Sequence, residues 1–183
     1  MRLNKTEILG AWIIELAPVH DPRGYFVRSW SMEKYAEYGL NPHIEYMAST
    51  YNALKGTLRG MHYQAFPYEE VKTIWCVHVA IYDVILDLRS DSPTYGKWCS
   101  IKLVAGDQRL LYVPEGVAHG YQTLEDHTEV TYAMSQRYEP ESARGVRWND
   151  PAFGIRWPQA VPTVISARDE EFVLWGEERT GEC

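Results

Sequence analysis

Short runs of alternating apolar and polar residues follow one another along most of the chain, and each has the length of a β-strand. Turn signals such as DPRG at 21–24, SDSPTYG at 90–96 and PEG at 114–116 separate many of them. The run 71–89 lacks a glycine to mark a turn, so a boundary near Val79 is expected from its length alone. The expected strands are 9–16, 25–30, 44–51, 58–64, 71–78, 81–88, 98–104, 109–113, 119–124 and 128–136.

Many short strands joined by Gly and Pro turns predict an all-β sandwich, barrel or jelly roll. Two helices interrupt this pattern. The first is expected over SMEKYAEYGL, with Ser31 as N-cap and Gly39 as the residue that ends it. The second is expected at about 166–178, beginning at Ser166. Because no repeat, low-complexity segment or linker is visible, we expect residues 1–183 to form one domain.

Composition supports a folded β-rich protein and limits its partners. The 183 residues are 45% hydrophobic and 13% aromatic, with 7 Trp and 13 Tyr. The net charge of -7 argues against binding of nucleic acid or a membrane surface, although a few local arginines can still hold a small anionic substrate. The N-terminal segment has no apolar stretch long enough for a signal peptide or a membrane span.

Three cysteines, Cys76, Cys99 and Cys183, form no Cys-x-x-Cys pair. Their odd number is more typical of a protein in a reducing compartment than of a disulfide scaffold. We therefore expect a cytoplasmic protein, with Cys76 as a small core residue.

The stretch GTLRGMHYQ at 56–64 places Arg59 and His62 inside a strand pattern, and PEGVAHG at 114–120 adds His119. Two ordinary strand histidines are the simplest interpretation. The two stretches also resemble the half-motifs of the cupin superfamily, whose small β-barrel usually holds a metal on three histidines and a glutamate. Gln64 stands where the first half-motif has its second histidine, so the ligand set is incomplete and we expect no metal.

Longer segments resemble the dTDP-4-dehydrorhamnose 3,5-epimerase family from about residue 8 to about residue 172. They are DPRGYF, GTLRGMHYQ, YDVILDLRSDSPTYGKW, LYVPEGVAHGYQTL, RYEPESARGVRWNDPAFGIRWP and ISARDE. The resemblance implies a cupin-type antiparallel β jelly roll (double-stranded β-helix) with short flanking helices, no cofactor, and usually a homodimer. The apolar run ILGAWIIEL is the strand that we expect to lie across the partner.

The implied reaction inverts sugar carbons next to the C4 ketone of a nucleotide-diphosphate 4-keto-6-deoxyhexose, in deoxysugar and polysaccharide biosynthesis. Such a reaction needs a base, a donor at the enolate oxygen, and an acid on the opposite face of the sugar. The resemblance assigns the base to His62 with Asp169 as its orienting carboxylate, the enolate donor to Lys72, and the acid to Tyr132. Arg59 and His119 match substrate-contacting positions.

Simpler interpretations of these residues stay open. Ser166-x-x-Asp169 is also a capping-box pattern. A lysine at the start of a strand is usually a rim charge, although strand parity places Lys72 on one face with Ile74 and Cys76. Asp83 matches a residue that supports the site, and a structural role is equally consistent.

The nucleotide-reading positions depart from the family. Arg23 and Phe26 are kept in DPRGYF, where the phenylalanine stacks on the base, but Arg28 replaces a glutamate that reads thymine. Because arginine only donates hydrogen bonds, we expect a weaker preference for dTDP, with CDP- and GDP-linked sugars as candidates. An Arg28 that points to solvent would leave the preference unchanged. Further departures are Met47 and Ser49 in place of Gln and Asn, Glu70 in place of Gln, and Ala143 in place of Glu.

Other functions compete with this prediction. A cupin 3,4-ketoisomerase, or an epimerase that inverts one carbon only, would use a similar site. A non-catalytic cupin that binds a sugar nucleotide is disfavoured by the complete set His62, Lys72, Tyr132 and Asp169. A metal-dependent cupin oxygenase is disfavoured by Gln64.

Overall fold

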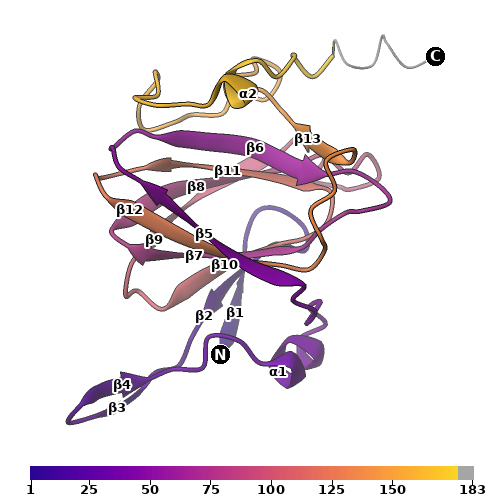
Figure 1. The fold of residues 1–183 in the computed structure, drawn as a ribbon. Helices are drawn as coiled ribbons and strands as arrows, with labels where there is room; N and C mark the ends of the chain where they lie inside the picture. Colours follow the sequence, from indigo (N-terminus) through magenta and orange to yellow (C-terminus); the bar gives the residue numbers. More distant parts are fainter. Residues whose placement is uncertain (177–183) are drawn as a thin grey trace.

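Two facing β-sheets form the body of the protein in a computed structural model, which describes residues 1–176 (Figure 1). The six-stranded sheet has the order β1-β2-β10-β7-β12-β5, and the five-stranded sheet the order β13-β6-β11-β8-β9. Neighbouring strands pair antiparallel throughout, which confirms the all-β prediction. The strands are β1 (Arg2–Lys5), β2 (Trp12–Glu15), β3 (Val19–Asp21), β4 (Gly24–Phe26), β5 (Tyr46–Asn52), β6 (Leu58–Gln64), β7 (Lys72–His78), β8 (Ala80–Asp87), β9 (Trp98–Val104), β10 (Arg109–Val113), β11 (Val117–Thr123), β12 (Thr128–Met134) and β13 (Ala143–Gly145).

The strands of the barrel lie where the alternation predicts them. The predicted bounds 58–64 and 109–113 are those of β6 and β10, and the other barrel strands from β5 to β12 agree within two residues at each end. Val79 alone separates β7 from β8, with a φ of +68°, and the chain passes there from one sheet to the other. The boundary predicted near Val79 is therefore confirmed.

The N-terminal predictions need two corrections. The expected strand 9–16 is the shorter β2, which pairs with β1 on one edge and β10 on the other. Since both edges of β2 are hydrogen-bonded within the chain, the expectation that this run lies across a partner is wrong for this strand. The expected strand 25–30 is one arm of a two-stranded hairpin, β3–β4, which ends at Phe26 and projects away from the barrel (Figure 1).

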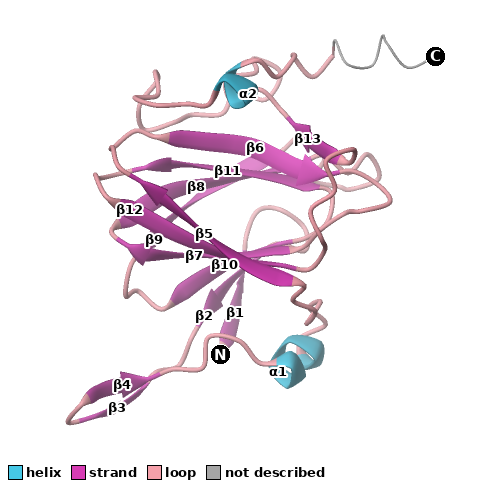
Figure 2. Cartoon of the chain, in the orientation of Figure 1, coloured by secondary structure: helices cyan, strands magenta, loops and turns pink. Residues whose placement is uncertain are grey.

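Only two short helices are present among the described residues, and neither is long and apolar enough to cross a membrane (Figure 2). Helix α1 (Met32–Glu37) begins and ends as predicted. The Ser31 hydroxyl accepts the Lys34 N–H at 3.5 Å, and Gly39 follows the helix with a φ of +70°. Its Tyr35 packs with Tyr112 on the outer face of the six-stranded sheet.

Helix α2 (Ala167–Glu170) is much shorter than the expected helix 166–178, of which residues 177–178 lie outside the described part. Ser166 is its N-cap, as predicted. The chain then leaves the helical path because the Trp175 N–H donates to the Asp150 carboxylate at 2.6 Å. The Trp175 ring also packs on Phe153, with 5.8 Å between ring centroids. These tertiary contacts outweigh the helical propensity of the segment.

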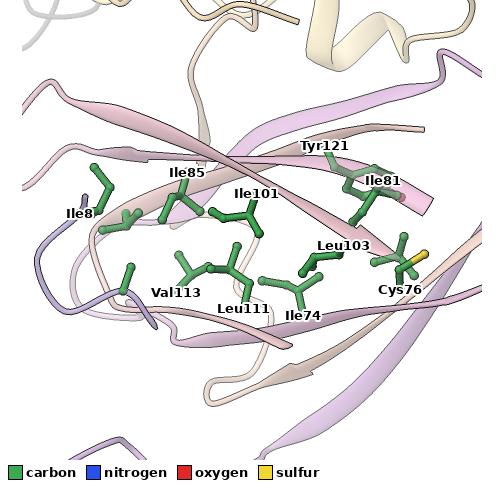
Figure 3. Packing of buried hydrophobic residues seen from close by; sticks show 13 residues of the cluster. Ile8, Ile74, Cys76, Ile81, Ile85, Ile101, Leu103, Leu111, Val113 and Tyr121 are labelled. Atoms are coloured by element: carbon green, nitrogen blue, oxygen red, sulfur yellow. The ribbon is translucent and has the colours of Figure 1, made fainter. Parts of the chain in front are cut away.

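The hydrophobic core fills the space between the two sheets, and Figure 3 shows side chains from both of them pointing into it. Ile74 and Leu111 come from the six-stranded sheet, and Ile85 and Leu103 from the five-stranded sheet. Cys76 belongs to this cluster, as predicted. Tyr121 is a member of the cluster and also lines the cavity described next, so the core and the cavity are continuous.

Candidate active site

A cavity of about 220 Å³ lies between the sheets beside the core. Strands β6 and β11 of one sheet and β5, β7 and β12 of the other contribute side chains to its wall. The structure brings five of the predicted site residues to this one cavity. The lining consists of Tyr46, Ala48, Thr50, Arg59, His62, Lys72, His119, Tyr121, Tyr132 and Met134.

A close approach between the paired strands β6 and β11, at a shift in their register, explains how Arg59 and His62 reach the same cavity. The two residues are three positions apart, so a regular strand would send them to opposite faces. A Cβ on Gly60 would lie 2.4 Å from the Cα of Gly120, and the register between the two strands shifts at this point. Glycine is required at position 60, where φ is +127°. The irregularity realigns the strand, and both polar side chains face inward.

His62 and Asp169 form a hydrogen-bonded pair at the edge of the cavity. The His62 Nε2 lies 2.7 Å from Asp169 Oδ1, and Asp169 Oδ2 accepts the Gly60 N–H at 3.1 Å. Because an ionised carboxylate only accepts, Nε2 carries the proton and Nδ1 is left as the basic nitrogen. Helix α2 places Asp169 for this contact, and the Asp169 N–H in turn donates to Ser166 Oγ at 3.2 Å. Asp169 therefore takes part in the N-cap of α2 through its backbone N–H and bonds His62 through its side chain.

The electrostatics of this pair keep the imidazole neutral and the carboxylate ionised. Burial lowers the pKa of His62 below its ordinary value, against the opposing effect of Asp169. Burial also acts against ionisation of Asp169, but its hydrogen bonds with His62 and Gly60 outweigh it and lower the pKa of Asp169. A neutral imidazole held by a carboxylate is the form that can accept a proton near neutral pH.

Lys72 enters the cavity as a buried ammonium group held by two oxygens. Its Nζ donates to the His62 carbonyl at 3.0 Å and lies 3.1 Å from Glu70 Oε1. Lys72 and Glu70 are 6% and 8% exposed, so this pair is largely withdrawn from water. Lys72 is therefore no rim charge, and its face is the one that strand parity predicts.

Two further groups complete the wall. His119 Nε2 lies 2.9 Å from Asp83 Oδ2, and burial raises the pKa of Asp83 while His119 opposes that shift. The Tyr132 hydroxyl lies 3.2 Å from Thr50 Oγ1, and burial raises the pKa of Tyr132 well above its ordinary value. Tyr132 is thus a neutral proton donor at physiological pH.

Gln64 is fully engaged with the backbone of two loops beside the cavity. Its Nε2 donates to the carbonyls of Tyr68 at 2.8 Å and Arg137 at 3.1 Å, and its Oε1 accepts the Glu139 N–H at 2.7 Å. Gln64 therefore fastens these loops to β6. Among residues 1–176, no three His, Cys, Asp or Glu side chains are grouped as a metal site.

A second hollow, of about 310 Å³, adjoins the cavity and shares Arg59 and His62 with it. Arg168, the second residue of α2, also lines this hollow. The Arg59 Nε is held by Asn52 Oδ1 at 2.8 Å. Two guanidinium groups at one hollow favour an anionic group of the phosphate kind.

Five residues predicted to bind substrate do not reach the cavity of their own chain. Arg23 lies in the turn of the projecting hairpin, and Phe26 lies at the other end of β4, opposite Val19. Arg28 lines a separate surface hollow near α1. Met47 is exposed, and Ser49 bonds Thr131 Oγ1 at 2.9 Å rather than lining the cavity.

Sequence reasoning missed other residues of the cavity. On β5 the inward residues are Tyr46, Ala48 and Thr50, and the period of two along this strand was the signal that places them. Met47 and Ser49, which were predicted to contact the substrate, are on the opposite face of β5 and point away from the cavity. Glu70 was noted only as a departure from the family, and nothing in the sequence identified it as the partner of Lys72.

An antiparallel two-sheet barrel with paired acids and bases around one cavity defines a cupin-type enzyme of the acid–base kind. The chain belongs to the dTDP-4-dehydrorhamnose 3,5-epimerase family, whose model matches residues 5–177. It is accordingly an isomerase of the carbohydrate-epimerase class. The predicted family, fold class and enzyme class are confirmed.

Relatives of known name match almost the whole chain. The dTDP-4-dehydrorhamnose 3,5-epimerase of Shigella flexneri is 37% identical over 170 residues, 92% of this chain and 93% of that protein. The dTDP-4-dehydrorhamnose 3-epimerase of Streptomyces niveus is 35% identical over 98% of this chain and 86% of its own length. A crystal structure of the Bacillus anthracis 3,5-epimerase with TDP and PPi bound is 36% identical, with a TM-score of 0.90 over 94% of this chain and 98% of that one.

Proposed function

We propose that the cavity epimerises a nucleotide-diphosphate 4-keto-6-deoxysugar at the carbons beside the ketone, in deoxysugar and polysaccharide biosynthesis. The observation that supports this most directly is the placement of His62 and Tyr132. His62 belongs to the five-stranded sheet and Tyr132 to the six-stranded sheet, yet both line one cavity. A base and an acid on opposing walls suit inversion, because the proton leaves one face of the sugar and returns to the other.

In the proposed mechanism the neutral His62 takes the proton from the carbon beside the ketone, and Asp169 stabilises the imidazolium that forms. The electron pair moves onto the ketone oxygen, where the Lys72 ammonium stabilises the enolate. When the ketone re-forms, Tyr132 delivers its proton to the opposite face of the carbon. After the product leaves, the phenolate of Tyr132 regains a proton from solvent and the His62 imidazolium releases one to solvent. His119 contacts the sugar, and Asp83 supports His119.

The diphosphate is proposed to lie in the adjoining hollow, between Arg59 and Arg168. This hollow shares Arg59 and His62 with the cavity, so a sugar in the cavity places its phosphates beside the guanidinium groups. An anion there is consistent with the Bacillus anthracis relative, which is described with TDP and PPi bound.

A panel of 4-keto sugar nucleotides in D₂O tests this function. We expect deuterium at C3, at C5 or at both, with dTDP favoured less strongly than is usual because Arg28 stands where the family has a glutamate that reads thymine. The panel contains dTDP-, UDP-, CDP- and GDP-linked 4-keto sugars, and NMR measures the deuterium at each carbon. Deuterium at one position only would identify a single-carbon epimerase. Turnover without deuterium at either carbon would contradict the function, and a strong preference for dTDP would contradict the altered selectivity.

We infer a homodimer in which the β3–β4 hairpin of one protomer covers the cavity of the other. Phe26 and Val19 are opposite one another on the hairpin and are each 69% exposed, which is unusual for large apolar side chains. This arrangement would bring Arg23, Phe26 and Arg28 to the partner's cavity, where the family resemblance needs them.

Light scattering is expected to give twice the chain mass of 21.2 kDa. Replacing Phe26 and Val19 together by Ser removes apolar surface from the hairpin, so we expect weaker association and a higher KM. Leu54→Ser, which changes an exposed apolar residue outside the hairpin, serves as the control. A monomer in the unsubstituted protein at micromolar concentration would contradict the dimer.

The pH profile tests the base. Because the pKa of His62 is lowered and its neutral form is active, kcat/KM should fall on the acid side below about pH 6.5, the ordinary value for histidine. Asp169→Asn removes a charge that raises the pKa of His62, so this acid limb should move to still lower pH. Its maximal rate should fall about 10- to 100-fold, since the imidazolium loses its partner. An unmoved limb in Asp169→Asn would contradict the assignment.

We also propose a cytoplasmic location and a single domain. The thiols of Cys76 and Cys99 are free, as a reducing compartment allows. The two sheets share one hydrophobic cluster, which supports one folding unit for the described residues.

A further inference from the structure

A chain of hydrogen bonds runs through the wall of the cavity from Arg59 to Tyr132. Arg59 Nε donates to Asn52 Oδ1 at 2.8 Å, and Asn52 Nδ2 lies 3.2 Å from the Tyr121 hydroxyl. The Tyr121 hydroxyl lies 2.8 Å from Thr50 Oγ1, which lies 3.2 Å from the Tyr132 hydroxyl. Asn52 and Tyr121 are 2% and 1% exposed, so bulk water does not compete for their bonds.

The direction of the first bonds is fixed by the chemistry of the donors. Arginine has no acceptor, so the oxygen of the Asn52 amide faces Arg59 and the nitrogen faces the other way. That nitrogen also donates to the Thr128 carbonyl at 3.2 Å, which is an acceptor only. Asn52 therefore donates its second N–H to the Tyr121 oxygen. The reverse bond, from the Tyr121 hydroxyl to Asn52 Oδ1, is longer at 3.4 Å.

The distances favour one order of donation among the later hydroxyls. The Tyr121 proton is assigned to Thr50 Oγ1, its shortest contact at 2.8 Å, and the Thr50 proton to the Tyr132 oxygen at 3.2 Å. In this order Tyr132 accepts from Thr50, and its own proton is available to a sugar in the cavity. The same donors stabilise the negative charge that Tyr132 holds after it has given that proton away.

We propose that Asn52, Tyr121 and Thr50 are positioning residues that direct the proton of Tyr132 toward the substrate and connect this acid to Arg59. The inference rests on the proposed function, in which Tyr132 is the acid. No proton travels along the chain, which sets only the orientation of the bonds. Arg59 has two tasks in consequence, since it faces the anionic hollow with its guanidinium group and fixes the Asn52 amide with its Nε.

The test separates removal of the carbon proton from its delivery on the opposite face. In D₂O, an enolate that Tyr132 does not protonate returns through His62, so deuterium enters substrate of unchanged configuration. We expect Tyr121→Phe and Thr50→Val each to slow inversion about tenfold relative to this wash-in, the effect of losing one hydrogen bond. Thr50→Ser keeps the hydroxyl and should restore the ratio.

Two matched controls remove a hydroxyl outside the chain of bonds. Tyr82→Phe alters the neighbouring strand β8 in a cluster away from the cavity, and Thr131→Val alters β12 outside the cavity lining. Both variants should keep the ratio of inversion to deuterium wash-in that the unsubstituted protein shows. Asn52→Asp should reverse the chain, because a carboxylate accepts the Tyr121 proton, and should slow inversion although every hydroxyl remains. Unfolding midpoints identify variants that are merely unstable.

Two results are decisive. If Tyr132→Phe abolishes inversion while Tyr121→Phe and Thr50→Val keep the unsubstituted ratio, the positioning role is wrong and the proposed function stands. If Tyr132→Phe inverts normally, the assignment of the acid is wrong, and the positioning role falls with it.

Discussion

His62→Asn is expected to lower the rate of proton exchange at the sugar carbons by roughly 10²–10⁴-fold, the usual contribution of a general base. Asp169 keeps its bond to the Gly60 N–H at 3.1 Å and its place in the first turn of α2 when the imidazole is removed. The pocket should therefore stay folded and bind the nucleotide with little change. The loss should appear in kcat rather than in KM.

His78→Asn is the matched control, because His78 is an exposed histidine outside the cavity lining. Its exchange rate should equal that of the unsubstituted protein. The measurement is deuterium uptake by NMR, together with titration of nucleotide binding. Near-normal exchange in His62→Asn would show that another group is the base.

Lys72→Met is expected to have two large effects with different origins. The first is a loss of about 10²–10³-fold in kcat, since the enolate oxygen loses its charged donor. The second is a loss of about 3–5 kcal/mol in the free energy of unfolding, because Glu70 is left as a buried charge without its partner. No other group would stabilise the Glu70 charge once Lys72 is replaced, since Glu70 Oε2 already lacks a hydrogen-bond partner among the described residues.

The double variant Glu70→Gln/Lys72→Met separates these effects. Removing the charge of Glu70 should recover most of the stability, while the rate should stay low because the ammonium group is still absent. Urea unfolding and turnover of the same preparations give the two quantities. Recovery of the rate along with the stability would mean that Lys72 has only a structural role.

The contrast between β9 and α2 shows what the sequence was able to predict. Alternation set the bounds of β9, where Ile101 and Leu103 are buried and Ser100 and Lys102 are exposed. The end of α2 depends on Asp150 and Trp175, which are 25 residues apart and meet only in the folded chain. The short strands β1 and β13 were missed for the same reason, since pairing with a neighbour rather than intrinsic propensity holds them in place.

The site was predictable to a similar depth. Strand parity placed Lys72 on an inward face, and the family resemblance supplied Arg59, His62, His119 and Tyr132. The other residues of the lining were missed. Strand parity alone places Arg59 and His62 on opposite faces of β6. The register shift at Gly60 that brings them to one face depends on the contact with β11 and is not visible in the sequence. The ion pair between Glu70 and Lys72 could not be predicted either, since Glu70 lies in the loop before β7 and nothing in the sequence sets its direction.

The close approach of Gly60 and Gly120 also sets a distance within the active site. Arg59 lies on one side of it and His62 on the other, so the backbone itself fixes the spacing between the proposed phosphate anchor and the reacting nitrogen. That spacing does not depend on the hairpin or on the outer residues of β5. The nucleobase that this scaffold recognises can therefore change during evolution or design. The reacting sugar carbon stays in place beside His62, the residue that deprotonates it.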